Sequence, residues 1–578
     1  MSSVEKEQKR ISRREFVKGA AAVAGAGVLA GCTKETPAPT TAPTAAPVAA
    51  STGAQECPSP WLPEKWDYEV DVVVVGAGFA AQASAIEAHD AGASVLMLEK
   101  APEEYQGGNS RVCGQGFLCP SPAIWDDYFE YLKAATAGLG FPVSEEHLRF
   151  YIEEGAKNIE WFEGMGAEVV TSVDLGRPLG VWIPFYPHFP GADALATEPG
   201  YYKVGGEYLG ASSNWRFLED QISQREGIRK VFETPAKRLV QDPVTREILG
   251  VVAESGGKEV YAKAKRAVCV CAGGWEYNQE MVRDFQGIPV NYSLGSPYNT
   301  GETIKMCWEA GADLRNMSVI AAPTGLAAGI FPEYQGTIGV SETPKEGGII
   351  TVGANNKRWR DEYRVIPRGI ENKEKAGVEG SHTGTGQIVE NGVYVRDKHP
   401  MPMHIIFNEA TRLSGPLFGW VKTMGWACVV EGYDPSADNS AELEMGWYVK
   451  ADTVRELATK IGRDPDALEE TVNRWNESCA AGEDLEWGRT TNLTPIEGGP
   501  VYAVQCFPMC LNTQGGMKRN TKSQVLDRWG KPIPRLYSAG ENGDIWTWVY
   551  QCMSNVGGGC YGYGRVAGQN AAAEEPWA

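Results

Sequence analysis

The sequence predicts an α/β fold built on a parallel sheet, and three neighbouring features support this prediction. A valine-rich run, Val70–Val75, has the composition of a strand that is buried on both faces. A glycine-containing turn and an alanine-rich helical stretch follow it, and Ser94–Leu98 is typical of a second strand. A strand, a helix and a second strand in this order form the repeating unit of parallel sheets.

The turn after the first strand has the pattern Gly76-x-Gly78-x-x-Ala81. Gly76 allows a tight turn, Gly78 lets a pyrophosphate approach the backbone, and Ala81 keeps helix and strand close together. Glu99 ends the second strand, where an acid can bind a ribose hydroxyl. Such a motif arises by chance when it stands alone. In this context it predicts a Rossmann-like dinucleotide-binding domain.

Length, charge and cysteine usage restrict the class of protein. The chain has 578 residues, more than one ordinary domain, and its formal net charge of −20 argues against nucleic acid or an anionic membrane surface as a partner. Its six histidines form no ligand pattern, and Cys506 and Cys510 lack a second close pair, so no metal site is expected. Cys269 and Cys271 alternate in an apolar stretch, which predicts buried thiols.

The N-terminal region has the features of an export signal. Arg13 and Arg14 precede an apolar run too short and too rich in Ala and Gly to span a bilayer, which is typical of a twin-arginine (Tat) signal for folded proteins. "LAGC" matches a lipobox, so residues 1–32 are expected to be a lipoprotein signal with Cys32 acylated; an ordinary cleaved signal is the alternative. Residues 33–66 are expected to be a disordered tether. These features predict a lipoprotein anchored to the cell membrane outside the cytoplasm.

A second glycine-rich loop, "YQGGNSRVCGQG" at residues 105–116, contains Gly107, Gly108, Asn109 and Ser110. A domain that binds NAD alone has no use for this loop. It resembles the loop of the fumarate reductase/succinate dehydrogenase flavoprotein family, in the soluble exported branch with flavocytochrome c fumarate reductase and urocanate reductase. The 3-ketosteroid dehydrogenases are more distantly similar. The resemblance implies FAD, held noncovalently because the loop contains no histidine.

The resemblance continues in family order from Asp67 onward, in residues 233–252, 267–282, 296–314, 511–541 and 554–568. It implies further FAD-binding residues: Ala236, Ala272, Gly273, Gly274, Gly301, Gly540, Glu541, Val556 and Gly557. It also implies an FAD-binding domain of residues 67–318 and 513–578, with an inserted α+β capping domain, residues 319–512, that closes over the flavin. The glycines from Gly557 onward open an apparent helix whose amino end would stabilise reduced flavin.

The substrate-binding residues of the family are missing. Family fumarate reductases hold a dicarboxylate with two histidines and an arginine, and protonate it with another arginine. The corresponding residues here are Ala322, Asn512, Asn555 and Ile366. A buried carboxylate without a cation is costly, so fumarate is expected to be a poor substrate. A single aromatic residue usually fills a core, but Trp546, Trp548 and Tyr550 together suggest a wide, largely neutral pocket for a bulky or aromatic molecule.

Candidates for proton transfer also follow from the resemblance. The family's proton-relaying glutamate and arginine correspond to Glu342 and Lys345 in "SETPK". Arg364 and Arg368 bracket the vacant position of the proton donor. The alternative for both arginines is a surface charge or a partner of nearby carboxylates.

These features predict an exported FAD-dependent reductase that transfers hydride to an activated unsaturated small molecule, a bulky or aromatic non-dicarboxylate, as the terminal acceptor of anaerobic respiration. The sequence has no second dinucleotide motif and no haem or iron–sulfur ligands, so electrons are expected from a separate donor, such as a membrane cytochrome or a flavin-carrying protein. One alternative is a 3-ketosteroid-dehydrogenase-like oxidation with Tyr363 or Tyr550 as base. Another is a non-enzymatic lipoprotein that binds a ligand or relays electrons through FAD.

Overall fold

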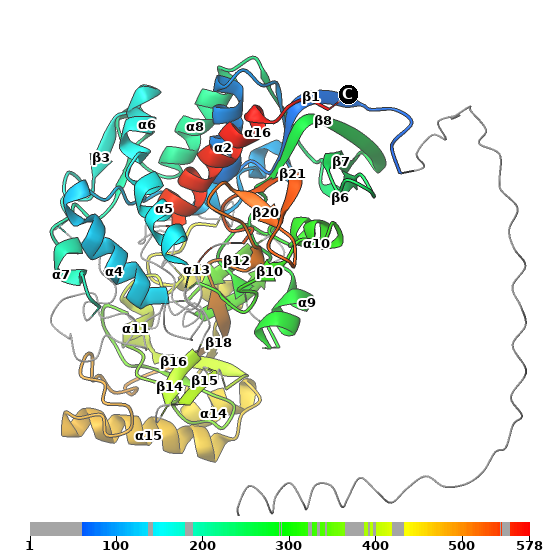
Figure 1. Cartoon of the computed structure of the whole chain (residues 1–578). Helices are drawn as coiled ribbons and strands as arrows, with labels where there is room; N and C mark the ends of the chain where they lie inside the picture. The colour runs from blue at the N-terminus through cyan, green and yellow to red at the C-terminus, as the bar shows by residue number, and fades with distance from the viewer. Residues whose placement is uncertain are drawn as a thin grey trace, which may run out of the picture. The chain divides into compact units, whose positions relative to one another are not determined.

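The computed structural model in Figure 1 describes most of the chain after residue 60. The described residues are 61–136, 143–177, 179, 189–287, 289–290, 292–321, 326–331, 336–340, 344–363, 387–390, 393–396, 400–418, 433–543, 545 and 555–577. All of them belong to one compact unit, residues 59–578. The predicted signal at residues 1–32, with Arg13, Arg14 and Cys32, and most of the predicted tether lie outside the described residues.

A mixed sheet forms the framework of the nucleotide-binding region. Its main path runs β20 (Gln524–Leu526), β21 (Pro532–Ser538), β8 (Lys258–Val270), β1 (Tyr68–Val75), β2 (Val95–Leu98) and β5 (Ile228–Val231). Neighbours from β21 to β5 are parallel, while β6 (Ala236–Gln241) and β7 (Ile248–Ser255) add an antiparallel extension beside β8. Val75 pairs with both Leu98 and Val270, so three strands end side by side. The predicted α/β class is confirmed.

The valine-rich strand β1 is buried on both faces, as predicted. Val72 and Val74 pack into one apolar cluster together with residues of α2 (Phe79–Asp90), α8 (Ser213–Ser223) and α16 (Tyr563–Ala573). Val73 and Val75 point the other way and pack with residues of α10 (Glu302–Glu309). Because successive side chains of a strand alternate between faces, an unbroken apolar run needs cover on both sides.

The first and last long helices of the described chain lie side by side on this sheet, as the blue α2 and the red α16 show in Figure 1. Ser84 of α2 donates a hydrogen bond from Oγ to the carbonyl of Gly564 at 2.9 Å. A Cβ at Gly568 would stand 2.2 Å from the carbonyl oxygen of Ser84, so this close approach requires glycine. Segments distant in sequence therefore build one layer.

Several shorter elements lie between β2 and β5 in sequence and after β8. They are α3 (Gly108–Val112), α4 (Trp125–Thr136), α5 (Glu145–Gly155), α6 (Asn158–Gly164), β3 (Val169–Thr171), α7 (Ala192–Leu195), β4 (Tyr202–Val204), α9 (Gln279–Met281), a π-helix at Val282–Gln286, β10 (Leu314–Arg315), β19 (Gly516–Met517), and 3₁₀ turns at Glu103–Tyr105, Pro122–Ile124 and Gly206–Tyr208. A second π-helix, Asn555–Gly562, leads into α16.

A second sheet is largely antiparallel. Its strands are β12 (Gly336–Gly339), β11 (Leu326–Phe331), β18 (Val501–Cys510), β16 (Met403–Asn408) and β13 (Ile349–Val352), with β17 (Val449–Ala451) and β9 (Tyr292–Ser293) also paired to β18. Its sequence region also contains the hairpin β14 (Gln387–Glu390)–β15 (Val393–Arg396), and helices α11 (Glu409–Leu413), α13 (Ser440–Glu444), α14 (Val454–Lys460) and α15 (Pro465–Ala481). The long strand β18 pairs with four other strands, β11, β16, β17 and β9, and so holds this region together. The boundaries 67–318, 319–512 and 513–578 stay a prediction.

Helix α15 shows how local sequence sets an element of the second region. Asp464 accepts hydrogen bonds from the backbone N–H groups of Asp466 and Ala467, and Pro465 occupies the first turn. The helix ends at Gly482, which has a φ of 71°. Both ends thus carry the residues expected of a helix boundary.

The structure bears on two further predictions from the sequence, one about residues 33–66 and one about two cysteines. Trp61, Leu62 and Trp66 pack against an apolar cluster of β6 and β7, so the chain is already packed within the stretch 33–66 that was expected to be a tether. Cys269 and Cys271 are buried free thiols, as predicted. In the described part of the chain, no helix combines the length and the hydropathy that a membrane span requires.

Candidate functional site

A deep pocket opens where the carboxyl ends of β1, β2 and β8 meet. It encloses about 1840 Å³, open solvent included. Most of the predicted cofactor residues line it, namely Gly76, Gly78, Glu99, Gly107, Gly108, Asn109, Ser110, Ala236, Ala272, Gly273, Gly301, Gly540, Glu541 and Val556. These residues come from two distant parts of the chain, one that ends at Gly301 and one that begins at Gly540. The pocket therefore forms only when both parts are folded together.

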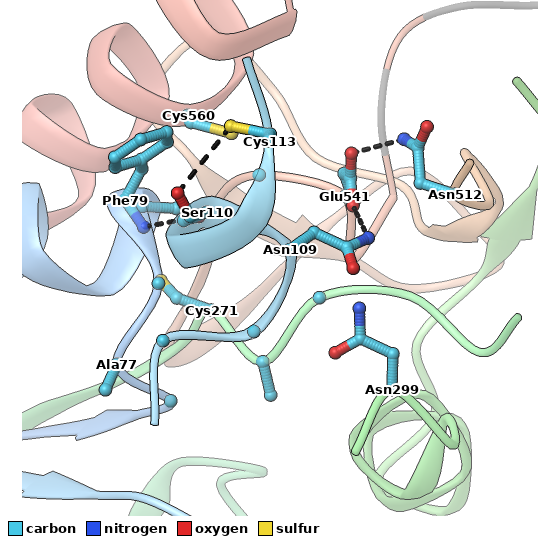
Figure 2. Close-up of a pocket in the computed structure, with 18 of the residues that line it drawn as sticks. Ala77, Phe79, Asn109, Ser110, Cys113, Cys271, Asn299, Asn512, Glu541 and Cys560 are labelled. Atoms are coloured by element: carbon cyan, nitrogen blue, oxygen red, sulfur yellow. Dashed lines mark hydrogen bonds between the residues drawn. The ribbon is translucent and has the colours of Figure 1, made fainter. Parts of the chain in front are cut away.

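The turn between β1 and α2 has the geometry that a phosphate site needs. Gly76 has a φ of 108°, and a Cβ there would lie 2.6 Å from the carbonyl oxygen of Cys271. At Gly78 a Cβ would lie 3.0 Å from Ser110 Oγ, and the N–H of Phe79 donates to this same oxygen at 2.9 Å (Figure 2). The first turn of α2 contains no acidic residue. An α-helix leaves its first N–H groups without a partner inside the helix; that of Phe79 is bonded to Ser110, and the others suit an anion.

Glu99 lies at the end of β2 and lines the same pocket. Its side chain is buried, and burial raises the pKa of the carboxyl group. Oε1 accepts a hydrogen bond from the N–H of Ala101 at 2.8 Å, which fixes the orientation of the carboxyl group. An acid at this place binds ribose hydroxyls in dinucleotide folds.

Three predicted cofactor residues do not line the pocket. Ala81 is completely buried in α2. A Cβ at Gly274 would meet Thr513 Oγ1 at 2.1 Å, and one at Gly557 would meet the carbonyl oxygen of Leu118 at 2.8 Å. Each of the three permits close packing behind the pocket wall.

Glu541 also lines the pocket, and amide side chains surround it; this part of the pocket is called the Glu541 end below, and the part around Glu99 and the turn at Gly76 the Glu99 end. Figure 2 shows the amide nitrogens of Asn109 and Asn512 pointing at this carboxylate. Asn109 donates to Oε2 at 3.3 Å, Asn512 donates to Oε1, and Asn555 donates to Oε1 at 3.4 Å. Asn512 and Asn555 are positions at which the family resemblance implies a histidine and an arginine. Here the amide groups of Asn512 and Asn555 donate hydrogen bonds to Glu541, an acid of the protein itself.

A second acid, Glu276, lies beside this end and is fully buried. It accepts hydrogen bonds from Asn109 at 2.8 Å, from Asn299 at 2.7 Å and from the hydroxyl of Thr513 at 3.0 Å. Burial is the largest influence and raises the pKa of Glu276. Asn109 therefore connects two carboxyl groups, one in the pocket wall and one behind it.

The wall near Glu541 also contains three residues that sequence reasoning missed: Arg177, Tyr201 and Lys203. The guanidinium carbon of Arg177 is 5.7 Å from the ring centre of Tyr201, and Nζ of Lys203 is 5.6 Å from it. Only the alternation of Tyr201, Tyr202 and Lys203 at the start of the short strand β4 could have indicated that Tyr201 and Lys203 share a face.

The predicted proton-transfer residues fall mostly outside the description. Glu342, Arg364, Arg368 and Tyr550 lie outside the described residues, as do Ala322, Ile366, Trp546 and Trp548. Lys345 is exposed. The hydroxyl of Tyr363 donates to the carbonyl of Pro344 at 2.9 Å and accepts from Asn492 at 2.6 Å, and Tyr363 does not line the pocket. Their catalytic roles stay predictions.

A buried ion network holds the segment that leads to Arg364. Glu362 receives hydrogen bonds from Arg358 at 2.9 Å and from Arg489 at 3.1 Å, and Arg358 also bonds Asp484 at 2.9 Å. These four side chains are completely buried, and their charges balance. A balanced network of this kind fixes the segment in place, because removing one charge would leave another buried and unpaired.

The glycine turn, the helix amino end and the buried acid after the next strand line one pocket and define a dinucleotide-binding fold. A family model described as an FAD binding domain matches residues 71–556. The chain belongs to this family, and it is an FAD-dependent oxidoreductase that acts on carbon–carbon bonds.

Individual relatives agree with this assignment. Digoxin reductase of Eggerthella lenta is 26% identical, with 99% of this chain and 98% of the relative covered. Among solved structures, the 3-ketosteroid delta1-dehydrogenase of Sterolibacterium denitrificans matches with a TM-score of 0.63 and 22% identity, covering 87% of this chain and 99% of that one. An open flavocytochrome c3 fumarate reductase matches with a TM-score of 0.61 and 22% identity, covering 88% and 79%. The predicted resemblance to fumarate reductase flavoproteins is confirmed.

Proposed function

We propose that this protein reduces an activated carbon–carbon double bond of a bulky or aromatic small molecule that is not a dicarboxylate. The observation that carries the proposal is that Asn512 and Asn555 both donate hydrogen bonds to the carboxylate of Glu541. Beside Asn512 and Asn555, one of the two carboxylates of a dicarboxylate would meet a protein carboxylate instead of the histidine and arginine that the family resemblance implies there, which is unfavourable in a buried site. Digoxin, which the name of one relative specifies, is such a bulky molecule.

Different residues along the pocket have different roles in this reaction. FAD, when bound, supplies hydride to the substrate carbon. The turn at Gly76 and Gly78 with the α2 amino end would hold the pyrophosphate, and Glu99 would hold a ribose. The carboxylate of Glu541, oriented by its amide partners, closes the end at which substrate would bind.

The test is an anaerobic reoxidation assay. The flavin of the purified holoprotein is reduced, and its spectrum is followed after addition of cinnamate, benzalacetone, a steroid enone or fumarate. We expect reoxidation by at least one bulky acceptor and at least about tenfold slower reoxidation by fumarate, since a buried charge without a partner costs more than 1.4 kcal/mol. Rapid reoxidation by fumarate alone would sink the proposal, and bleaching of oxidised flavin by a steroid ketone would favour the dehydrogenase alternative.

We also propose that the protein is exported through Arg13 and Arg14 and anchored by a lipid on Cys32, where it takes electrons from a membrane cytochrome or a flavin-carrying protein and serves anaerobic respiration. The support is the sequence pattern at residues 1–32 and a cofactor that is enclosed by distant segments of the chain and must be inserted before export. Replacing Arg13 and Arg14 by Lys should keep the protein in the cytoplasm. Cys32→Ala should release it from the membrane fraction, and unchanged fractionation of both variants would refute this assignment.

A further inference from the structure

Arg177, Tyr201 and Lys203 form a cluster in the pocket wall that none of the roles above uses. Tyr201 is only 4% exposed, and both cations lie within 6 Å of its ring, at 5.7 Å and 5.6 Å. Two positive charges beside an aromatic face suit a planar molecule that carries a negatively charged or strongly accepting oxygen.

The backbone holds this cluster firmly. Strand β3 pairs antiparallel with β4, and the N–H of Ser172 donates to the carbonyl of Tyr201 at 2.9 Å. The N–H of Arg177 in turn donates to the carbonyl of Ser172 at 2.9 Å, so Arg177 is fixed to the strand that carries Lys203. Tyr202 exchanges backbone hydrogen bonds with Phe117 at 2.9 and 3.0 Å. Tyr201 and Lys203 lie on either side of Tyr202 in sequence and therefore share the face toward the pocket.

Lys203 of this cluster and Glu541 both lie close enough to Cys113 to act on its thiol. The pKa of the Cys113 thiol is raised to about 12, mainly by burial; the charge of Glu541 contributes to the rise and that of Lys203 opposes it. Both charges therefore act on the same pocket-lining thiol. Burial also lowers the pKa of Lys203, and the charge of Arg177 adds to this effect. Within the described part of the chain, no carboxylate forms an ion pair with Lys203.

We propose that Arg177 and Lys203 bind the conjugated carbonyl or carboxylate oxygen of the substrate, with Tyr201 against its ring. The inference rests on the proposed function and names how the acceptor is recognised. Hydride adds to the carbon remote from the activating group, and the electron pair of the double bond moves toward the conjugated oxygen. A proton from solvent then adds to the neighbouring carbon, and the electron pair returns from the oxygen to form the C–H bond. The two cations stabilise the charge that collects on that oxygen.

The experiment measures binding without turnover. Hydrocinnamate and benzylacetone, the saturated counterparts of cinnamate and benzalacetone, are titrated into oxidised holoprotein while the flavin spectrum is followed. We expect Lys203→Met and Arg177→Met to weaken hydrocinnamate binding at least about tenfold each, because each removes a charged hydrogen-bond donor. Benzylacetone, which has no full charge, should lose less. Lys203→Arg should retain most of the affinity.

The matched control is Lys133→Met, which removes an exposed lysine that pairs with Glu145 at 2.9 Å outside the pocket. It should bind both probes as the natural protein does. Unchanged hydrocinnamate binding in Lys203→Met and Arg177→Met, or no saturable binding to the natural protein, overturns the proposal. So does a loss of FAD or a shifted flavin potential with unchanged probe binding, since the cations would then serve the cofactor.

Failure of the proposed binding site can be distinguished from failure of the proposed reductase function. If reduced holoprotein is not reoxidised by cinnamate or benzalacetone while the saturated probes bind in a manner that depends on Lys203, the reductase proposal fails for these acceptors and the binding site stands. If reoxidation is fast in both the natural protein and Lys203→Met, with unchanged binding, the reductase proposal stands and the binding site fails.

Discussion

The Glu99 end and the Glu541 end of the pocket differ in whether backbone or side-chain groups form them. The Glu99 end consists of backbone turns that follow parallel strands, with Gly76 and Gly78 allowing Cys271 and Ser110 to approach the main chain closely. The Glu541 end consists of side chains, in which amides from three distant segments converge on one carboxylate. A backbone site tolerates little change of residue type, whereas a side-chain site can be altered one residue at a time while the fold persists. Within one family, the cofactor end can thus stay fixed while the substrate end changes.

The largest effect should come from Gly76→Ala at the backbone end. The new Cβ would lie 2.6 Å from a carbonyl oxygen, and the φ of 108° is a conformation that alanine avoids. Together these effects cost about 3 kcal/mol or more, equivalent to at least about a hundredfold loss of FAD affinity. FAD per chain, measured from the absorbance of the purified protein, checks this.

Gly92→Ala is the matched control for that prediction. Gly92 has a similar φ of 92°, but no atom stands within 4 Å of its would-be Cβ, and it lies outside the pocket. The control should lose some stability and keep its FAD. Equal loss of FAD in both variants would show that backbone strain in general, and not the pocket, is responsible.

A smaller effect, confined to the other end, is expected from Glu541→Leu. The amides of Asn109, Asn512 and Asn555 would lose an acceptor, at a cost of about 1–3 kcal/mol. We expect reoxidation by the best acceptor to slow at least about tenfold, while FAD per chain falls less than in Gly76→Ala. Glu541→Gln, which keeps one acceptor oxygen, should fall in between. A protein that lost FAD completely would contradict the division between the two ends.

The two ends also differ in how far the sequence predicts them. The strand, turn, helix and acid from Val70 to Glu99 are contiguous, and each obeys a local rule, so their structure follows from reading the chain in order. The residues around Glu541 meet only through tertiary folding. Their separation in sequence, such as 432 positions between Asn109 and Glu541, leaves no local pattern to read. Family resemblance pointed to Asn512 and Asn555, and to Glu541 as an FAD-binding residue, but not to the hydrogen bonds that join them.

Arg177 and Lys203 escaped prediction for the same physical reason. Their side chains meet only because β3 and β4 pair and because Tyr202 is bonded to Phe117. Register between short strands separated by a long connection is set by the packing of the whole region, since a two- or three-residue strand carries too few side chains to specify it. The second sheet was likewise predicted only as a region, without its strand order.

Ser110→Ala tests the junction between the two glycine-rich turns and should have a moderate effect. The hydroxyl accepts the N–H of Phe79 at 2.9 Å, so its loss leaves one donor at the amino end of α2 without this partner. The expected cost is about 1 kcal/mol, or about fivefold in FAD affinity. Fluorescence titration of deflavinated protein with FAD measures it. Ser110→Thr should preserve the hydrogen bond and the affinity.

The smallest effect concerns pH and the buried acid behind the Glu541 end. Burial raises the pKa of Glu276 above its ordinary value of 4.5, so the folded protein holds this proton more tightly than the unfolded chain. Its contribution to stability is therefore full below the unfolded value and is lost as the pH rises through the raised pKa. Glu276→Gln stays neutral and keeps an oxygen that can accept from Asn109, Asn299 or Thr513.

The difference in unfolding free energy between the natural protein and Glu276→Gln should thus shrink, or change sign in favour of the variant, as the pH rises above the ordinary value of 4.5, with a slope of at most about 1.4 kcal/mol per pH unit. Urea unfolding of the FAD-loaded proteins measures this difference. A difference that grows with pH would mean that its hydrogen bonds hold Glu276 ionised, and the Glu541 end would then contain two negative charges joined by Asn109.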